Sequence, residues 1–121
     1  RKLLTLSDLE GEWRVMAVEG EGVTHTMVTM TFNTKERNFS LYAGCNHIGG
    51  QMAQHERSAD AIQFEYIGMT EMYCGEEVDK LERQLAEALD KVRSFYGIGE
   101  DVYMANEDDN VVLHFCRKQQ P

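Results

Sequence analysis

Ala43-Gly44-Cys45-Asn46-His47-Ile48-Gly49-Gly50 and Met69-Thr70-Glu71-Met72-Tyr73-Cys74 are the two most informative stretches of this chain. In the first stretch, glycines surround a cysteine and an asparagine, a composition typical of a turn between two strands. The second stretch leads directly into Glu76 and Glu77. Acidic residues favour the start of a helix, because the helix dipole is positive at that end. The two stretches therefore mark where strands turn and where a helix begins.

Apolar residues alternate with polar ones on both sides of the first stretch, which predicts antiparallel strands. The predicted strands span residues 12–18, 24–32, 39–45, 48–52 and 60–67. In the last of these, Ile62, Phe64 and Tyr66 are expected on one face. The glycines within residues 48–52 indicate a bulge or a close approach of the backbone.

The hydrophobic period changes after the second stretch. Residues 76–96 place apolar side chains at helical spacing, which predicts one long helix that Gly97 and Gly99 end. The stripe consists of Val78, Leu81, Leu85, Leu89, Val92 and Tyr96. The acidic residues of this helix are interpreted as part of a face exposed to solvent. These residues are Glu76, Glu77, Asp79, Glu82 and Glu87.

Two final strands, residues 101–105 and 110–117, close the chain. Short connections between strands favour antiparallel pairing, and the apolar stripe of the helix needs a sheet to cover. The predicted fold class is α+β, with a curved, barrel-like antiparallel sheet and one long helix packed on it before the last hairpin. At 121 residues, the chain is expected to be a single domain over residues 1–121.

The charge of the chain excludes some partners. The net charge of −9 argues against binding to nucleic acid, whose phosphates would repel it, and against docking on anionic lipid. No apolar run approaches the roughly 20 residues that a transmembrane helix needs. The three cysteines allow one disulfide and one free thiol, and their spacing contains no Cys-x-x-Cys pair.

Four motifs together resemble the META domain of HslJ-type bacterial proteins. They are Gly44-Cys45-Asn46 with Gly49-Gly50, Thr70-Glu71-Met72-x-Cys74, Leu9-x-Gly11-x-Trp13 and Tyr96-x-Ile98-x-x-x-Val102-x-Met104. The resemblance implies an exported, heat-shock-type domain of the cell envelope, in the periplasm or at the cell surface, and a lipid anchor upstream, as in a lipoprotein. It implies a role in stress or antibiotic tolerance, no agreed biochemical activity, no enzymatic reaction, no cofactor and no named protein partner or ligand.

The resemblance also implies that the two stretches meet in space. Cys45 and Cys74 are then candidates for a disulfide in an oxidising compartment, and Cys116 would be free, with no assigned role. The alternative is that Cys45 and Cys74 are buried free thiols, which behave as small hydrophobic side chains. A structural role in the same region is expected for Gly44, Asn46, Gly49, Gly50, Thr70 and Met72. Asn46 is interpreted as a turn residue that tolerates a left-handed backbone.

Two other hypotheses concern these residues. A zinc site would draw on Cys45, His47, Cys74 and Cys116, but structural zinc usually takes ligands in closely spaced pairs. A nucleophilic Cys45 beside His47 or His114 would need an exposed thiolate, whereas the pattern predicts a buried one. We therefore expect no catalytic and no metal-binding residues.

A carrier of small apolar ligands is the alternative function. Gly11-x-Trp13 is also typical of the first strand of lipocalin-like barrels. A barrel interior with a large enclosed apolar cavity would favour the carrier, and an interior filled with side chains would argue against it.

Overall fold

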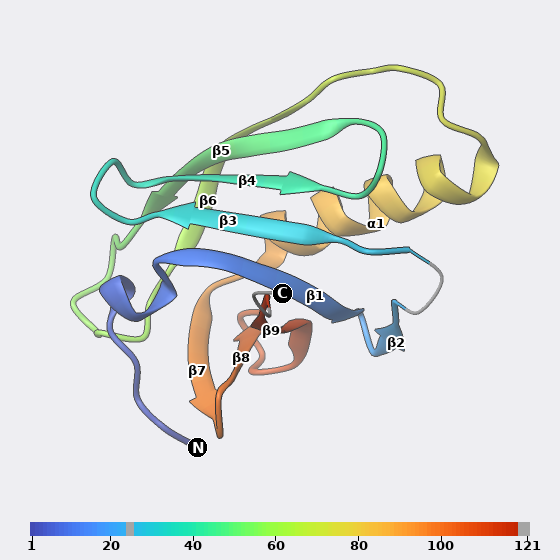
Figure 1. Ribbon diagram of the computed structural model, residues 1–121. Helices are drawn as coiled ribbons and strands as arrows, with labels where there is room; N and C mark the ends of the chain where they lie inside the picture. The colour runs from blue at the N-terminus through green and yellow to red at the C-terminus, as the bar shows by residue number, and fades with distance from the viewer. Residues whose placement is uncertain (24–25, 119–121) are drawn as a thin grey trace.

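The computed structural model describes residues 1–23 and 26–118, which form one curled antiparallel sheet and one long helix (Figure 1). The strands are β1 (Gly11–Val18), β2 (Glu21–Gly22), β3 (Thr29–Asn33), β4 (Asn38–Tyr42), β5 (His47–Ala53), β6 (Gln63–Met69), β7 (Ser94–Ile98), β8 (Asp101–Ala105) and β9 (Val111–Arg117). A short 3-10 helix, η1 (Leu6–Leu9), precedes β1, and the helix α1 (Glu76–Lys91) lies between β6 and β7. The predicted fold class, a barrel-like sheet with one helix before the last strands, is confirmed.

The sheet follows the order β6-β5-β4-β3-β1-β9-β8-β7, and β2 pairs with β1. Each neighbouring pair is antiparallel. The sheet curls, and α1 lies against its concave side in contact with β6, β9 and β1 (Figure 1). Within the described residues, no helix combines the length and the hydrophobicity that crossing a bilayer requires.

Large side chains fill the space between the sheet and α1. The largest fully buried ones are Phe32, Phe95, Phe115, Leu9, Met30, Leu41, Ile48, Ile62, Leu85, Leu89, Met104 and Leu113. The Trp13 ring packs edge-on against Phe115 with 5.3 Å between centroids, and Trp13 Nε1 donates a hydrogen bond to Leu9 O at 2.7 Å. Aromatic rings thus occupy the place where a carrier barrel would hold its ligand, which argues against the carrier.

Two segments outside the regular strands cover the outer edge of β7. Lys2 and Gly97 exchange two backbone hydrogen bonds, of 2.6 and 2.9 Å. On the same edge, Ile62 N donates to Arg93 O at 3.1 Å and Phe95 N donates to Asp60 O at 3.0 Å. The loop before β6 therefore meets β7 and brings the two ends of the sheet together at one point.

A bulge between β5 and β6 contradicts one prediction. Tyr66 was expected to share a face with Phe64, but Tyr66 is 81% exposed and has a φ of 54°. The pairing register shifts here, between Gly49 and Gln51. The extra residue turns the Tyr66 side chain outward and pushes the Glu65 carbonyl toward β5, where a Cβ on Gly50 would lie only 2.6 Å from it. The bulge therefore requires a glycine at position 50.

The helix is shorter than its apolar stripe predicts. It ends at Lys91, and Ser94–Ile98 forms β7 against β8. Tyr96 was wrongly placed on the helix; its ring stacks on Tyr103 across the β7–β8 pair, with 5.7 Å between centroids. The strand predicted for residues 24–32 begins at Thr29, and residues 24–25 lie outside the described ranges.

Candidate functional site

The two informative stretches lie side by side and are joined covalently. A disulfide links Cys45, in the turn between β4 and β5, to Cys74, which lies just before α1. The two Cα atoms are 6.1 Å apart, although 29 residues separate them in sequence. Both cysteines are half-buried. The disulfide implied by the resemblance is confirmed.

Asn46 is the polar centre of this junction and is only 3% exposed. Its Oδ1 accepts hydrogen bonds from Thr70 Oγ1 and from Met72 N, both at 2.9 Å. Its Nδ2 donates to Met72 O at 2.9 Å. The amide therefore pairs with both backbone groups of Met72, as a neighbouring strand would. An aspartate here would lose the donor of this pair.

The left-handed residue of this turn is Gly44, with a φ of 106°. Asn46 has no positive φ, so its interpretation as a left-handed turn residue is wrong. The turn depends on the backbone of Gly44 and on the side chain of Asn46.

The helix supplies Glu82, which is 1% exposed and faces the turn. Its Oε2 accepts a hydrogen bond from Asn46 N at 2.8 Å, and its Oε1 accepts one from Asn46 Nδ2 at 2.9 Å. The interpretation of Glu82 as part of a solvated face is therefore wrong. A signal for its burial was available: Glu82 lies four residues after Val78 and three before Leu85, on the apolar stripe itself.

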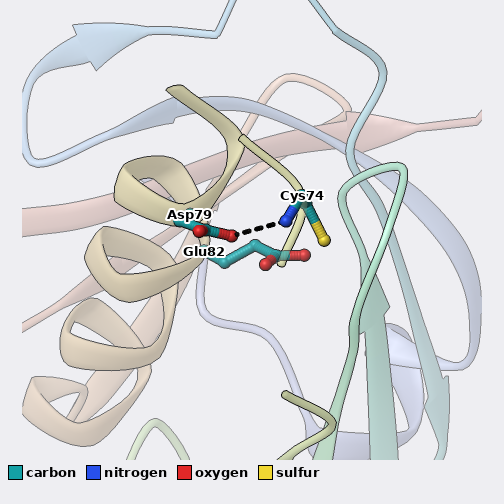
Figure 2. Close-up of side chains that lie close together, drawn as sticks. All are labelled: Cys74, Asp79 and Glu82. Atoms are coloured by element: carbon teal, nitrogen blue, oxygen red, sulfur yellow. Dashed lines mark hydrogen bonds between the residues drawn. The ribbon is translucent and has the colours of Figure 1, made fainter. Parts of the chain in front are cut away.

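A second carboxylate lies beside the disulfide. Asp79 Oδ1 accepts a hydrogen bond from Cys74 N at 3.2 Å, as Figure 2 shows. Cys74 Sγ and one carboxylate oxygen each from Asp79 and Glu82 all lie within 4.8 Å of one another. The ion pairs among residues 1–23 and 26–118 involve neither carboxylate. Among the described residues, the hydrogen-bond donors to these two carboxylates are Cys74 N, Asn46 N and Asn46 Nδ2, which are all neutral.

The other candidates from the sequence lie outside this junction or contribute only backbone. His47 N donates to Thr70 Oγ1 at 3.0 Å, while the exposed His47 ring stacks on Tyr42 with 4.7 Å between centroids. Cys116 is a free cysteine on β9, and β4, β3 and β1 separate that strand from β5 in the sheet. The four residues of the predicted zinc alternative are thus not brought together.

The hypothesis of a nucleophilic cysteine also lacks support from this geometry. The Cys45 sulfur is bonded in the disulfide. His114 is on β9, which β3 and β1 separate from β4 in the sheet, and its Nε2 lies 2.9 Å from Asp101 Oδ2. Chemically, the arrangement holds segments together: it combines one covalent bond with an amide and a carboxylate that satisfy one another.

Comparisons with known proteins agree with this fold. A family model described as META domain matches residues 5–120. No curated protein matches the chain. A solved structure of a DUF4847 family protein from Bacteroides vulgatus is similar at a TM-score of 0.65 and 13% identity, and the match covers 93% of this chain and 96% of that one. A protein from Burkholderia xenovorans, solved by NMR, is similar at a TM-score of 0.70 and 18% identity, over 95% of this chain and 87% of that one. At these identities, the two structures show the fold alone.

Proposed function

Because the chain belongs to the META domain family, we propose that it is a single non-enzymatic domain of the bacterial cell envelope, with a structural or binding role in stress or antibiotic tolerance. Its place would be the periplasm or the cell surface, as part of a lipoprotein whose anchor precedes this chain. The Cys45–Cys74 disulfide carries the proposal. Structural disulfides form and persist in oxidising compartments and are rare in the cytosol.

The use of the polar groups at the junction supports a role without catalysis. Both oxygens of Glu82 accept hydrogen bonds from Asn46, and the Asn46 amide is also paired with Met72. Cys45 and Cys74 have no thiolate while they are bonded to each other. These groups are bonded to one another, which favours a structural role over a catalytic one.

The surface charge supports partners other than nucleic acid or anionic lipid. The net charge of −9 would oppose both at short range. A protein partner or a small ligand in the envelope is compatible with this charge.

The experiment that tests the location is a thiol count in intact cells. A tagged copy of the natural gene is expressed in its own bacterium, free thiols are alkylated at once, and the cells are fractionated. We expect the protein in the envelope fraction with one alkylated cysteine per chain, Cys116. A protein in the cytoplasmic fraction with three alkylated cysteines would contradict the proposal.

Complementation tests the role in tolerance. A strain that lacks the gene is expected to be more sensitive to heat or to antibiotics than its parent. The gene with Cys116→Ser should restore tolerance, whereas the gene with both Cys45→Ser and Cys74→Ser should restore it poorly. Equal growth of the deletion strain and its parent under every stress would remove this part of the proposal.

A further inference from the structure

Four side chains with metal-binding atoms converge where α1 meets the turn between β4 and β5. They are the sulfurs of Cys45 and Cys74 and the carboxylates of Asp79 and Glu82. We propose that reduction of the disulfide converts this cluster into a binding site for a divalent metal ion of the zinc class. The two thiolates and the two carboxylates would be its ligands. The inference goes beyond the proposed function and does not depend on where the protein is located.

The distances suit a small tetrahedral ion. Zinc binds thiolate sulfur at about 2.3 Å and carboxylate oxygen at about 2.0–2.2 Å, so its ligand atoms lie roughly 3–4 Å from one another. Figure 2 shows the side chains of Cys74, Asp79 and Glu82 close together, and their ligand atoms lie within 4.8 Å of one another. The Cys45 sulfur is bonded to that of Cys74. The proposal requires side-chain rotations after reduction that bring all four ligand atoms to this spacing.

The carboxylates have free lone pairs for an ion. Each oxygen of Glu82 accepts one hydrogen bond from Asn46, which leaves a second lone pair on each. Asp79 accepts from Cys74 N through Oδ1. Asn46 would orient Glu82 as an outer-shell partner, an arrangement that strengthens metal sites in general.

Charge is the second argument. The Glu82 carboxylate is 1% exposed, and its hydrogen-bond donors in the described part of the chain are the two neutral N–H groups of Asn46. Buried charges are normally paired with opposite charge or bound to a metal. Reduction would place two thiols beside it, and a cation that displaces their protons would be held by thiolates and carboxylates together.

The redox step balances with a dithiol as the reductant. The dithiol supplies two electrons and two protons and becomes a disulfide, the Cys45–Cys74 bond breaks, and two thiols form. Metal binding then releases the two thiol protons. In the oxidised chain the sulfurs are not thiolates, so only two carboxylates remain and affinity is low. The bound ion would tie the turn to α1 in place of the covalent bond.

Cobalt(II) is the probe for the first test. The purified chain is reduced with a phosphine that does not bind the metal, and cobalt(II) is added. We expect thiolate-to-cobalt charge-transfer bands and intense visible bands of a tetrahedral site, saturating at one ion per chain and abolished by zinc(II). The oxidised chain should show none of these bands. Their absence from the reduced chain, or their presence in the oxidised chain, would overturn the proposal.

Variants identify the ligands. Cys116→Ser should leave the bands unchanged, and Cys45→Ser or Cys74→Ser should weaken the charge-transfer band and the affinity. Glu82→Gln should lower the affinity for cobalt(II) by about tenfold or more, whereas Glu87→Gln, an exposed position on the same helix, should not. Equal affinity of Glu82→Gln and Glu87→Gln would show that Glu82 is not a ligand and would refute the four-ligand site.

Folding of the reduced chain is monitored in the same samples. If far-ultraviolet circular dichroism shows that reduction unfolds the chain, stoichiometric zinc(II) is expected to restore the native spectrum, because the site exists only in the folded state. A reduced chain that stays unfolded with zinc(II) present would also refute the proposal.

Discussion

Asn46 binds both oxygens of the Glu82 carboxylate, with its backbone N–H at 2.8 Å and its side-chain amide at 2.9 Å. One residue of a turn thus satisfies a carboxylate of a helix 36 positions away in sequence. Neither residue is more than 3% exposed, so water cannot replace either partner without opening the junction. The stability of the junction should therefore depend strongly on this pair.

Asn46→Ala should lower the free energy of unfolding by about 1–3 kcal/mol, because it leaves a buried carboxylate without one of its donors. The measurement is urea denaturation under non-reducing conditions. Tyr73→Ala is the matched control: Tyr73 lies in the same junction but is 81% exposed, and its change should stay within about 0.5 kcal/mol. Equal effects of the two substitutions would contradict the importance of the pair.

Removal of the disulfide should also destabilise the fold. The bond closes a loop with a sequence separation of 29, for which the chain-entropy estimate is about 3.6 kcal/mol. We expect the double variant with Cys45→Ser and Cys74→Ser to lose approximately that amount in urea denaturation, and Cys116→Ser to lose much less. A double variant as stable as the parent would show that the hydrogen bonds alone hold the junction.

Gly50→Ala should be destabilising by about 1–3 kcal/mol, as overpacking usually is. The new Cβ would lie 2.6 Å from Glu65 O and 3.0 Å from an atom of the Phe39 ring. The Glu65 carbonyl belongs to the backbone, so it cannot rotate away as a side chain can. Gly68→Ala is the control on the adjacent strand, since its Cβ would meet nothing within 4 Å. Thermal or urea denaturation compares the two, and a similar loss in both would refute the steric explanation.

The start of η1 predicts a pH dependence. Asp8 Oδ2 accepts hydrogen bonds from Thr5 N at 2.7 Å and from Thr5 Oγ1 at 3.1 Å, and these bonds lower the pKa of Asp8 below its ordinary value. A carboxylate with a lowered folded-state pKa stabilises the fold above its unfolded-state pKa of about 3.9. This stabilisation is lost as the pH falls through the folded-state value.

Asp8→Asn keeps an acceptor at this position but removes its charge. It should therefore be less stable than the parent at neutral pH and equal to it in strong acid. Denaturation series of both proteins across acid pH measure the difference. A difference that is independent of pH would mean that the charge of Asp8 has no part in it.

Much of the fold could be predicted from local patterns. Alternation identified β1, β6 and β9 approximately, because one face of each strand packs on the core while the other is more exposed. The helix end was missed because Val92 and Tyr96 continue the helical spacing by coincidence, while pairing of Ser94–Ile98 with β8 gives that segment a ladder of hydrogen bonds.

The site was predictable only in part. Cys45 and Cys74 were paired by a family resemblance, since spacing along the chain does not reveal which segments meet. The partners of Asn46 lie 26 and 36 residues away, at Met72 and Glu82, so no local pattern contains them. Burial of Glu82 could have been inferred from its place on the apolar stripe, but acidic residues are so rarely buried that composition argued the other way.

The covered edge of β7 affects how the protein can aggregate at high concentration. An open strand edge offers unpaired N–H and C=O groups to a strand of another molecule, which is a common route to aggregation. Here the backbone groups of Gly97 on this edge are hydrogen-bonded to Lys2. Phe95 N is hydrogen-bonded to Asp60 O, and Arg93 O to Ile62 N. The chain thus blocks one end of its own sheet from intermolecular pairing, and crowded copies cannot extend the sheet from one molecule to the next at β7.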